Sequence, residues 1–326
     1  MGDLPKERSR FIRPFANSGV DYCGPFLIKE KKERNRNKVK VYVSIFVCLS
    51  TKAVHLELVS DLKSYLNYLT TEAFLAVLRR FFSRRGKANL LMSDNATNFV
   101  GARNELRDLG KFINTNKTAI VHRLSEQGVD WKFIPPRAHH FGGLWEAAVR
   151  SFKYHLYRVS KHTLFTFEQF NTLIIEIEAI LNSRPLTPLS TEPGDLAVLS
   201  PGHFLIGDSL LSVPEADFTD TPSNRLAHWQ HIQKLKRDFW VRWNKEYLTE
   251  LTQRTVKSRE RSPELQVGDL VILREINAPP LYWPTGRVVK LYPGNDDIVR
   301  VIEVKTANGI YKRAVKNVAL LPIQRN

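Results

Sequence analysis

The chain has few cysteines, and this shortage limits the covalent and metal chemistry available to it. Only two of its 326 residues are cysteine, and Cys23 and Cys48 both lie in apolar, strand-like runs. We interpret them as small buried side chains in a reducing compartment, with a disulfide as the less favoured alternative. Two cysteines so placed, together with nine scattered histidines, do not supply a zinc framework.

Long hydrophobic segments are also lacking. The longest apolar run, Val41–Leu49, is far shorter than the roughly 20 residues that a membrane-spanning helix needs. The first 15 residues are charged and have no apolar centre, so they do not resemble a signal peptide. We therefore expect an intracellular, soluble protein with no membrane partner.

Acidic residues are scarce relative to basic ones. The chain has 33 Asp and Glu against 49 Lys and Arg, which gives a formal net charge of +16 and a pI near 9.8. The excess is spread along the chain and is not confined to a tail. A folded protein of this kind most often binds a polyanion, above all nucleic acid. The alternative is a basic surface that serves solubility alone.

The first two thirds of the chain alternate between strand and helix patterns. Strands are predicted over 19–28, 39–49, 53–59 and the residues before Asp94, and a short one over 131–135. Helices are predicted from Thr71 to Gly86, over 99–115, over 144–159 and over 166–182. This order indicates an α/β domain in which helices cover the faces of a mixed sheet.

Three carboxylates occupy similar positions in this pattern. Asp21 lies on the first strand, Asp94 follows a short apolar strand, and Glu146 lies where a Gly-Gly loop is expected to lead into a helix. A carboxylate at the end of a buried strand is held in place yet exposed, which suits a metal ligand. Taken singly, such an aspartate more often only starts a turn. Neighbouring strands could nevertheless bring Asp21 and Asp94 together.

The predicted helix over 144–159 has two distinct faces. Leu144, Ala148, Phe152, Leu156 and Val159 recur at helical spacing and are expected to face the core. Glu146, Arg150, Lys153 and Tyr157 lie on another face. That face could be an ordinary solvated one with an ion pair. It could also present an acid to a metal and cations to DNA phosphates.

The last third of the chain predicts a connection, a long helix and a small β domain. Residues 183–220 are rich in Pro, Ser, Thr and Asp, and a helix over 225–255 carries aromatic residues that we interpret as a packing seam. Five short β-rich runs over 267–322 predict a small barrel. Its cations, among them Arg287, Lys312 and Arg313, could contact phosphates or could simply be solvated.

Several of these stretches together resemble the integrase of Pao/BEL-type LTR retrotransposons. They are GVDYCGPF, CLSTKAVHLELVSDL, SDNATNFVGA, FGGLWEAAVRSFK, ILNSRPLTPLS and the C-terminal run that begins GDLVILREINAPP. The resemblance implies a ribonuclease-H-like catalytic core over 16–200 and a linker with a long helix over 201–262. It also implies a small SH3-like β-barrel over 263–326. Residues 1–15 would then be the end of a preceding zinc-binding domain.

The resemblance also implies a chemistry, a cofactor and partners. Asp21, Asp94 and Glu146 would form the catalytic triad and bind two Mg²⁺ or Mn²⁺ ions, which prefer oxygen ligands. The reaction would be DNA strand transfer without a covalent enzyme intermediate. DNA would be the substrate and partner, with no small-molecule substrate. A homo-oligomer and a nuclear location, reached from the cytoplasm by import, would be expected.

The sequence departs from the family pattern at a few positions, and this leaves alternatives open. Ala96 stands where the family has Gly, His139 where it has Pro, and Lys63–Leu69 resembles extra sequence. With no zinc-binding module before the core, one alternative is a catalytically silent or domesticated DNA-binding remnant. A ribonuclease H acting on RNA–DNA hybrids is a further alternative on the same fold.

Overall fold

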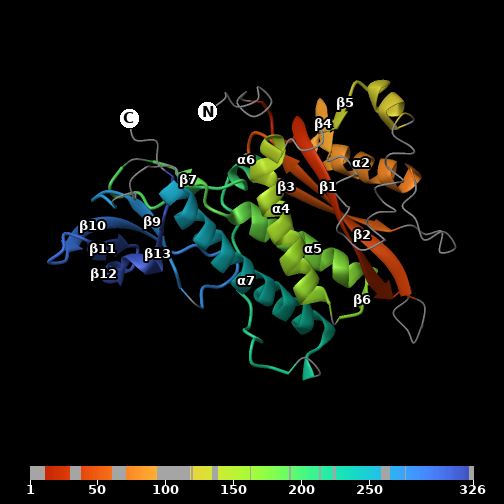
Figure 1. Ribbon diagram of the computed structural model, residues 1–326. Helices are drawn as coiled ribbons and strands as arrows, with labels where there is room; N and C mark the ends of the chain where they lie inside the picture. The colour runs from red at the N-terminus through yellow and green to blue at the C-terminus, as the bar shows by residue number, and fades with distance from the viewer. Residues whose placement is uncertain are drawn as a thin grey trace. The chain divides into compact units, whose positions relative to one another are not determined.

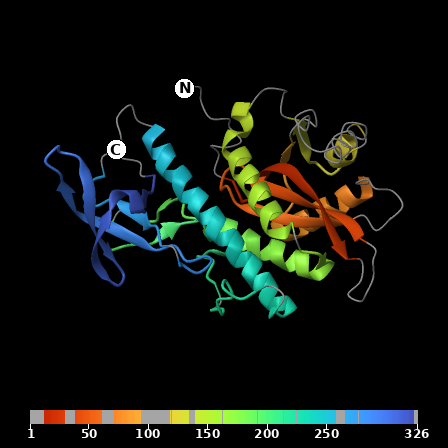
Figure 2. The ribbon, with the colours of Figure 1, turned by 60° about the horizontal axis from the view of Figure 1, so that its bottom comes forward.

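The computed structural model describes the chain in two compact units (Figures 1 and 2). The described residues are 12–29, 38–60, 71–93, 118, 120–133, 139–161, 163–190, 192–212, 214–222, 225–257, 265–275 and 277–322. The first unit is Met1–Glu178 and the second is Ala179–Asn326. Asp94 and the helix predicted over 99–115 lie outside the described residues. The four-part division drawn from the sequence stays a prediction.

The first unit is built on a mixed sheet with the strand order β3-β2-β1-β4-β5. Its strands are β1 (Asn17–Lys29), β2 (Lys38–Cys48), β3 (Val54–Ser60), β4 (Leu90–Ser93) and β5 (Asp130–Phe133). The first three are antiparallel neighbours, whereas β4 is parallel to both β1 and β5. The short β6 (Phe165–Thr166) also pairs with β1. The predicted ribonuclease-H-like mixed sheet is confirmed, and β1 is its central strand.

Helices α2 (Thr71–Arg85), α4 (His139–Ser160) and α5 (Phe167–Ser183) accompany this sheet (Figure 1). Successive side chains of a strand point to opposite faces. Tyr22 of β1 lies against Phe74 of α2, with ring centroids 6.1 Å apart, while Asp21 contacts Lys153 of α4. Helices α2 and α4 therefore lie on opposite faces of the sheet.

Helix α4 begins earlier than the sequence pattern predicts. The predicted start was near residue 144, but the helix begins at His139, so Gly142 and Gly143 lie within its first turns. The expected Gly-Gly loop before the helix is thus wrong. A glycine inside a helix costs only about 1 kcal/mol relative to alanine, which the packing of the later turns can outweigh. Phe152, Leu156 and Val159 are buried, as their spacing predicts.

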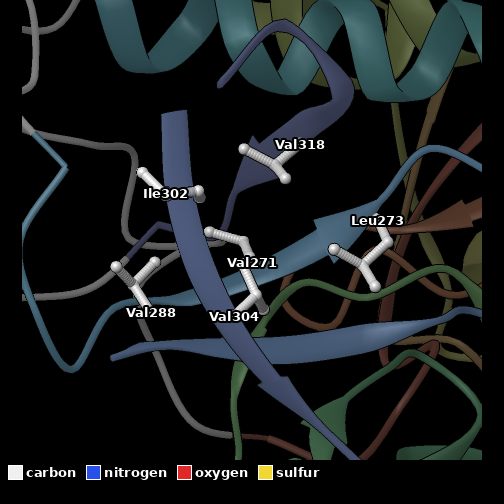
Figure 3. Close-up of a cluster of buried hydrophobic side chains, with 6 residues drawn as sticks. All are labelled: Val271, Leu273, Val288, Ile302, Val304 and Val318. Atoms are coloured by element: carbon white, nitrogen blue, oxygen red, sulfur yellow. The ribbon is translucent and has the colours of Figure 1, made fainter. Parts of the chain in front are cut away.

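The second unit contains a five-stranded antiparallel sheet with the strand order β12-β11-β10-β9-β13. Its strands are β9 (Leu270–Leu273), β10 (Thr285–Pro293), β11 (Val299–Thr306), β12 (Gly309–Ala314) and β13 (Val318–Leu320), with a 3₁₀ turn at Val315–Asn317. Aliphatic side chains fill its core, namely Val271, Leu273, Val288, Ile302, Val304 and Val318 (Figure 3). Five strands were predicted here, and the sheet is that of a small SH3-like domain.

The long helix of the second unit is α7 (His228–Lys257) (Figure 2), and several of its aromatic residues are buried. Phe239, Trp240 and Trp243 are buried, while Trp229 is 51% exposed. Short elements precede the helix: β7 (Thr187–Pro188), β8 (Val198–Leu199) and α6 (His203–Ile206). The aromatic residues of this helix therefore form the predicted packing seam, except for Trp229.

Candidate active site

Asp21 is a fixed carboxylate on the central strand of the first unit. It lies opposite Ile45 of β2, on a strand whose other neighbour is β4. Its Oδ1 accepts a hydrogen bond from the Tyr22 N–H at 2.6 Å, and its Oδ2 accepts a hydrogen bond from the Lys153 Nζ at 2.6 Å. The Asp21 side chain is 17% exposed. It is thus held in one position but remains within reach of solvent.

An irregularity in β1 follows directly after Asp21. The pairing with β2 shifts between Cys23 and Phe26, as in a β-bulge. Gly24 has φ +130°, and a Cβ there would lie 3.1 Å from both the Tyr42 ring and the Val41 carbonyl oxygen. Only glycine fits this backbone without strain. Bulges bend a strand and re-aim its side chains, and this one begins two residues after Asp21.

The end of β4 lies at the same level of the sheet as Asp21. In the parallel pairing of β1 with β4, Val20 is the partner of Ser93, so the residues that precede Asp21 and Asp94 lie side by side. Ser93 is buried, and its Oγ accepts a hydrogen bond from Trp131 Nε1 at 2.8 Å. This side-chain bond and the flanking strands β1 and β5 fix the end of β4. Asp94 itself lies outside the described residues.

Helix α4 carries both Lys153 and Glu146. The two positions are seven residues apart, about two helical turns, so they share one side of the helix. Of Glu146 only the backbone is described. Among the side chains that the structure describes, no group of three or more His, Cys, Asp or Glu could hold a metal. Of the three side chains in the predicted triad, the structure thus describes only that of Asp21.

The residues next to Asp21 remain uncharged. Burial raises the pKa of the Cys23 thiol to about 12, with a smaller lowering by Lys153 and a raising by Asp21. Burial first, and the Asp21 charge second, also raise the pKa of Tyr22 well above its ordinary value. The thiolate is the form of cysteine that binds metals, and burial disfavours that form at Cys23. Asp21 supplies the one negative charge of this stretch.

The exposed face of α4 is basic and aromatic. Arg150, predicted as a DNA contact, is exposed, and Tyr157 is 42% exposed. The same face also carries Tyr154 and Arg158, which the sequence pattern did not mark. The Arg158 guanidinium lies 5.3 Å from the centre of the Tyr154 ring. Tyr154 lies four residues after Arg150, and Arg158 lies four residues after Tyr154, a helical spacing that could have identified both from the sequence.

The three cations predicted for DNA contact in the C-terminal sheet have different surroundings. Arg287 is 5% exposed, and its guanidinium donates to the carbonyl oxygens of Gly268 at 2.8 Å and Asp195 at 2.6 Å. Its guanidinium is therefore not available to a phosphate, because it is buried and bonded to carbonyl oxygens of the second unit. Lys312 is exposed, with Nζ 4.8 Å from the centre of the Tyr292 ring, and Arg313 lies over Tyr311.

Comparisons with known proteins bear mainly on the fold. A protein family described as a family of unknown function (DUF5641) matches residues 227–321, from the residue before α7 to the residue after β13. No curated protein matches the chain.

Solved structures of retroviral integrases are among those that the chain resembles. The simian T-cell lymphotropic virus intasome in complex with the PP2A regulatory subunit B56 gamma is 10% identical with a TM-score of 0.37, over 100% of this chain and 85% of that one. The BIV integrase catalytic core is 13% identical with a TM-score of 0.31, over 59% and 95%. The HTLV-2 integrase catalytic core in complex with magnesium is 14% identical with a TM-score of 0.31, over 60% and 99%. Values this low leave the function to be argued from the residues of the chain.

Proposed function

We propose that the chain is an integrase-type polynucleotidyl transferase that joins DNA strands with the help of divalent metal ions. The observation that supports it best is the pairing of β1 with β4. Asp21 projects from the central strand, and the chain leaves β4 one residue before Asp94 at the same level of the sheet. The motif resemblance assigns these two residues and Glu146 of α4 to one catalytic triad of the Pao/BEL type.

The surroundings of Asp21 fit a metal ligand. A cationic group, the Lys153 ammonium, lies 2.6 Å from its Oδ2, so the position already accommodates positive charge. Asp21, Asp94 and Glu146 would together hold the ions, two Mg²⁺ or Mn²⁺, since hard cations prefer oxygen ligands. When bound, such ions supply Lewis-acid stabilisation of the attacking and leaving oxygens. The chain's own contribution is to fix the carboxylates and to position the DNA.

The exposed face of α4 fits DNA as the substrate. It presents Arg150 and Arg158 with Tyr154 and Tyr157, a combination suited to phosphates and to the faces of unpaired bases. Of the helices that the structure describes, none is long and apolar enough to cross a membrane. A homo-oligomer acting in the nucleus, with the retroelement's own DNA ends and target DNA as partners, belongs to the same proposal.

The test is a strand-transfer and nicking assay on DNA oligonucleotides with Mg²⁺ or Mn²⁺. We expect Asp21→Asn to lower the rate by at least about 100-fold, the loss typical when one charge-stabilising group leaves an active site. Asp94→Asn and Glu146→Gln should behave alike. A matched control is Asp130→Asn, because Asp130 lies on β5 of the same sheet with a 60% exposed side chain. The strand-transfer rate of Asp130→Asn should stay within about twofold of the wild-type rate, because the ion pair that Asp130 makes with Lys132 is exposed.

The outcomes separate this function from the alternatives. Equal rates for the wild type and Asp21→Asn would contradict the proposal. Salt-sensitive DNA binding without metal-dependent strand transfer would support the inactive DNA-binding remnant instead. Cleavage of an RNA–DNA hybrid, with no joining of DNA strands, would support the ribonuclease H alternative.

A further inference from the structure

The ion pair between Lys153 and Asp21 involves the same carboxylate that the proposed function assigns to metal binding. The Lys153 Nζ lies 2.6 Å from Oδ2, and the two side chains are only 28% and 17% exposed. They come from two different elements, α4 and β1, which are 132 residues apart in sequence. A pair this short and this shielded from water differs from the loose ion pairs of a protein surface.

An ammonium group and a divalent ion compete for this carboxylate. Its two oxygens have about four lone-pair positions, and the Tyr22 N–H and the Lys153 Nζ already occupy one on each oxygen. A metal ion bound to Asp21 would lie within a few ångströms of the Lys153 charge. Two positive charges at that distance repel each other strongly in a partly buried site. Metal binding is therefore easier when the ammonium has moved away.

Lys153 has a second place to which its charge can go. Its side chain is long and flexible and carries three donors that can rotate. Arg150 and Tyr157 lie one turn before and one turn after it on α4, on the exposed side proposed to bind DNA. A released ammonium would join these residues and meet a DNA phosphate there.

We propose that Lys153 is an exchangeable counter-ion: it neutralises Asp21 until divalent ions bind, and it then transfers its charge to a DNA phosphate. This inference rests on the proposed function, because it requires Asp21 to be a metal ligand. It assigns Lys153 a positioning role, and it explains how the carboxylate stays oriented before the ions arrive.

The first test measures the affinity of the full chain for Mn²⁺ without DNA, from the electron paramagnetic resonance of free Mn²⁺. Lys153→Gln removes the competing charge and should lower the Mn²⁺ dissociation constant about 3- to 10-fold, a range reasonable for one partly exposed charge. Lys153→Arg keeps the charge and should stay within about twofold of the wild type. Lys161→Gln is the matched control, since Lys161 is an exposed lysine that directly follows the same helix.

The controls separate a failure of this inference from a failure of the proposed function. Asp21→Asn should weaken Mn²⁺ binding both in the wild type and beside Lys153→Gln. If Mn²⁺ binding depends on Asp21 but Lys153→Gln binds no tighter than Lys161→Gln, the exchange is refuted and the proposed function survives. If Mn²⁺ binding does not depend on Asp21, the metal site itself is refuted. Thermal unfolding of each variant checks that it is folded.

The second test reads the transfer to DNA from the salt dependence of binding. Each phosphate contact steepens the slope of log K against log salt by about 0.9. With a random-sequence duplex, addition of Mg²⁺ should make the wild-type slope steeper than that of Lys153→Gln by about 0.9, one extra contact. Without Mg²⁺ the two slopes should agree, because Lys153 is then held by Asp21. A Lys153 contribution that is the same with and without Mg²⁺ would overturn the proposal.

Discussion

The first unit has a partly buried cluster of charged side chains at the edge of its sheet, whereas the second unit has a cluster of tryptophan and tyrosine rings beside its long helix. In the first unit His55 and Glu57 of β3 are 1% and 5% exposed. His55 Nε2 lies 3.2 Å from Glu57, and its Nδ1 lies 3.2 Å from Glu178 of α5. Arg80, Arg84 and Arg85 of α2 complete the ion pairs. We call these six residues the edge network.

The edge network also closes an open strand edge. β3 is the outermost strand of its sheet, and the Glu178 carboxylate accepts the Leu56 N–H at 2.8 Å, a backbone donor that no neighbouring strand pairs with. Arg80 likewise donates to the Leu58 carbonyl oxygen at 2.8 Å. An unpaired edge invites association with other strands, so these side chains protect it. The Glu178 carboxylate and the Arg80 guanidinium are thus both engaged with the backbone of β3.

The second unit relies on what we call the tryptophan cluster, formed by Trp240, Trp243, Tyr247 and Trp283. The Trp283 ring meets the other three edge-on, at centroid distances of 4.9, 6.1 and 5.6 Å. The indole N–H groups of Trp240 and Trp283 each donate a hydrogen bond, to the Ala278 carbonyl oxygen and to Ser183 Oγ respectively. The cluster carries no charge. The stability of the two units should therefore respond differently to mutation and to pH.

The largest expected effect is that of Trp283→Ala on the second unit. Removing a buried tryptophan costs about 3–5 kcal/mol, because apolar contacts are lost and a cavity is left. Hydrogen exchange followed by mass spectrometry should show lower protection in α7 and the C-terminal sheet and unchanged protection in β1–β3. Trp229→Ala, at a 51% exposed position of the same helix, should change stability by no more than about 0.5 kcal/mol. Equal losses for both variants would mean that the cluster does not stabilise the unit.

Glu57→Gln should produce the next largest loss, now in the first unit. Breaking a buried ion pair from one side costs about 3–5 kcal/mol. Arg80 and Arg84 are 42% and 51% exposed and can be rehydrated, so we expect about 2–3 kcal/mol. Urea unfolding measures the change. Glu126→Gln is the matched control, since Glu126 pairs with His122 in the same unit but is 62% exposed; a loss as large as that of Glu57→Gln would contradict the role of burial.

The strands of both units could be predicted because the local sequence of each strand favours extended structure. Periodicity and β-branched residues mark β1, β2 and β9–β13, and the turns between the C-terminal strands carry Gly, Pro and Asn. The start of α4 could not be predicted from the same signals. There the tertiary contacts of Phe152 and Leu156 stabilise a helix that extends back through two glycines.

The candidate site was only partly accessible to sequence reasoning. The position of Asp21 on a strand follows from the pattern, but the contact of Lys153 with Asp21 depends on how α4 lies across the sheet. The edge network was missed, although His55 and Glu57 alternate with Leu56 and Leu58, which are buried. Polar residues inside a strand of this kind are a signal for a paired, buried site. Sequence alone does not identify their partners, because Glu178 lies more than 100 residues away.

The pH dependence of stability should have opposite signs in the two units between about pH 5.5 and 8, the range in which histidines titrate. Burial alone would lower the pKa of His55, but hydrogen bonds to Glu178 and Glu57 outweigh it and raise the pKa above its ordinary 6.5. A raised pKa in the folded state gives stability that is present below pH 6.5 and lost as the pH rises through the folded value. Burial, together with Lys234 and His228, lowers the pKa of His231 in the second unit. That unit should instead lose stability as the pH falls below 6.5.

Hydrogen exchange corrected for the intrinsic rate at each pH would measure both slopes in one sample. A slope of one proton corresponds to about 1.4 kcal/mol per pH unit, which is the upper limit of the slope that a single histidine can contribute. His55→Gln should remove the slope from β2, β3 and α2, and His231→Gln should remove it from α7. Slopes of the same sign in both units of the wild type would show that other groups dominate.

The smallest expected effect is a change in the salt dependence of DNA binding, and it distinguishes an exposed cation from a buried one in the C-terminal sheet. Lys312 is exposed beside the Tyr292 ring, whereas Arg287 is 5% exposed and bonded to two carbonyl oxygens. If the sheet contacts DNA, Lys312→Gln should reduce the slope of log K against log salt by about 0.9 and leave stability unchanged.

Arg287→Gln should do the reverse. It removes the donors of the Gly268 and Asp195 carbonyl oxygens and should lower the free energy of unfolding by about 1–3 kcal/mol, the cost of unsatisfied buried groups. Its salt slope, measured at a temperature where it is folded, should equal that of the wild type. A reduced slope for Arg287→Gln would mean that this guanidinium leaves its buried position to reach DNA. The two cations, equivalent in the sequence, would then be equivalent in binding as well.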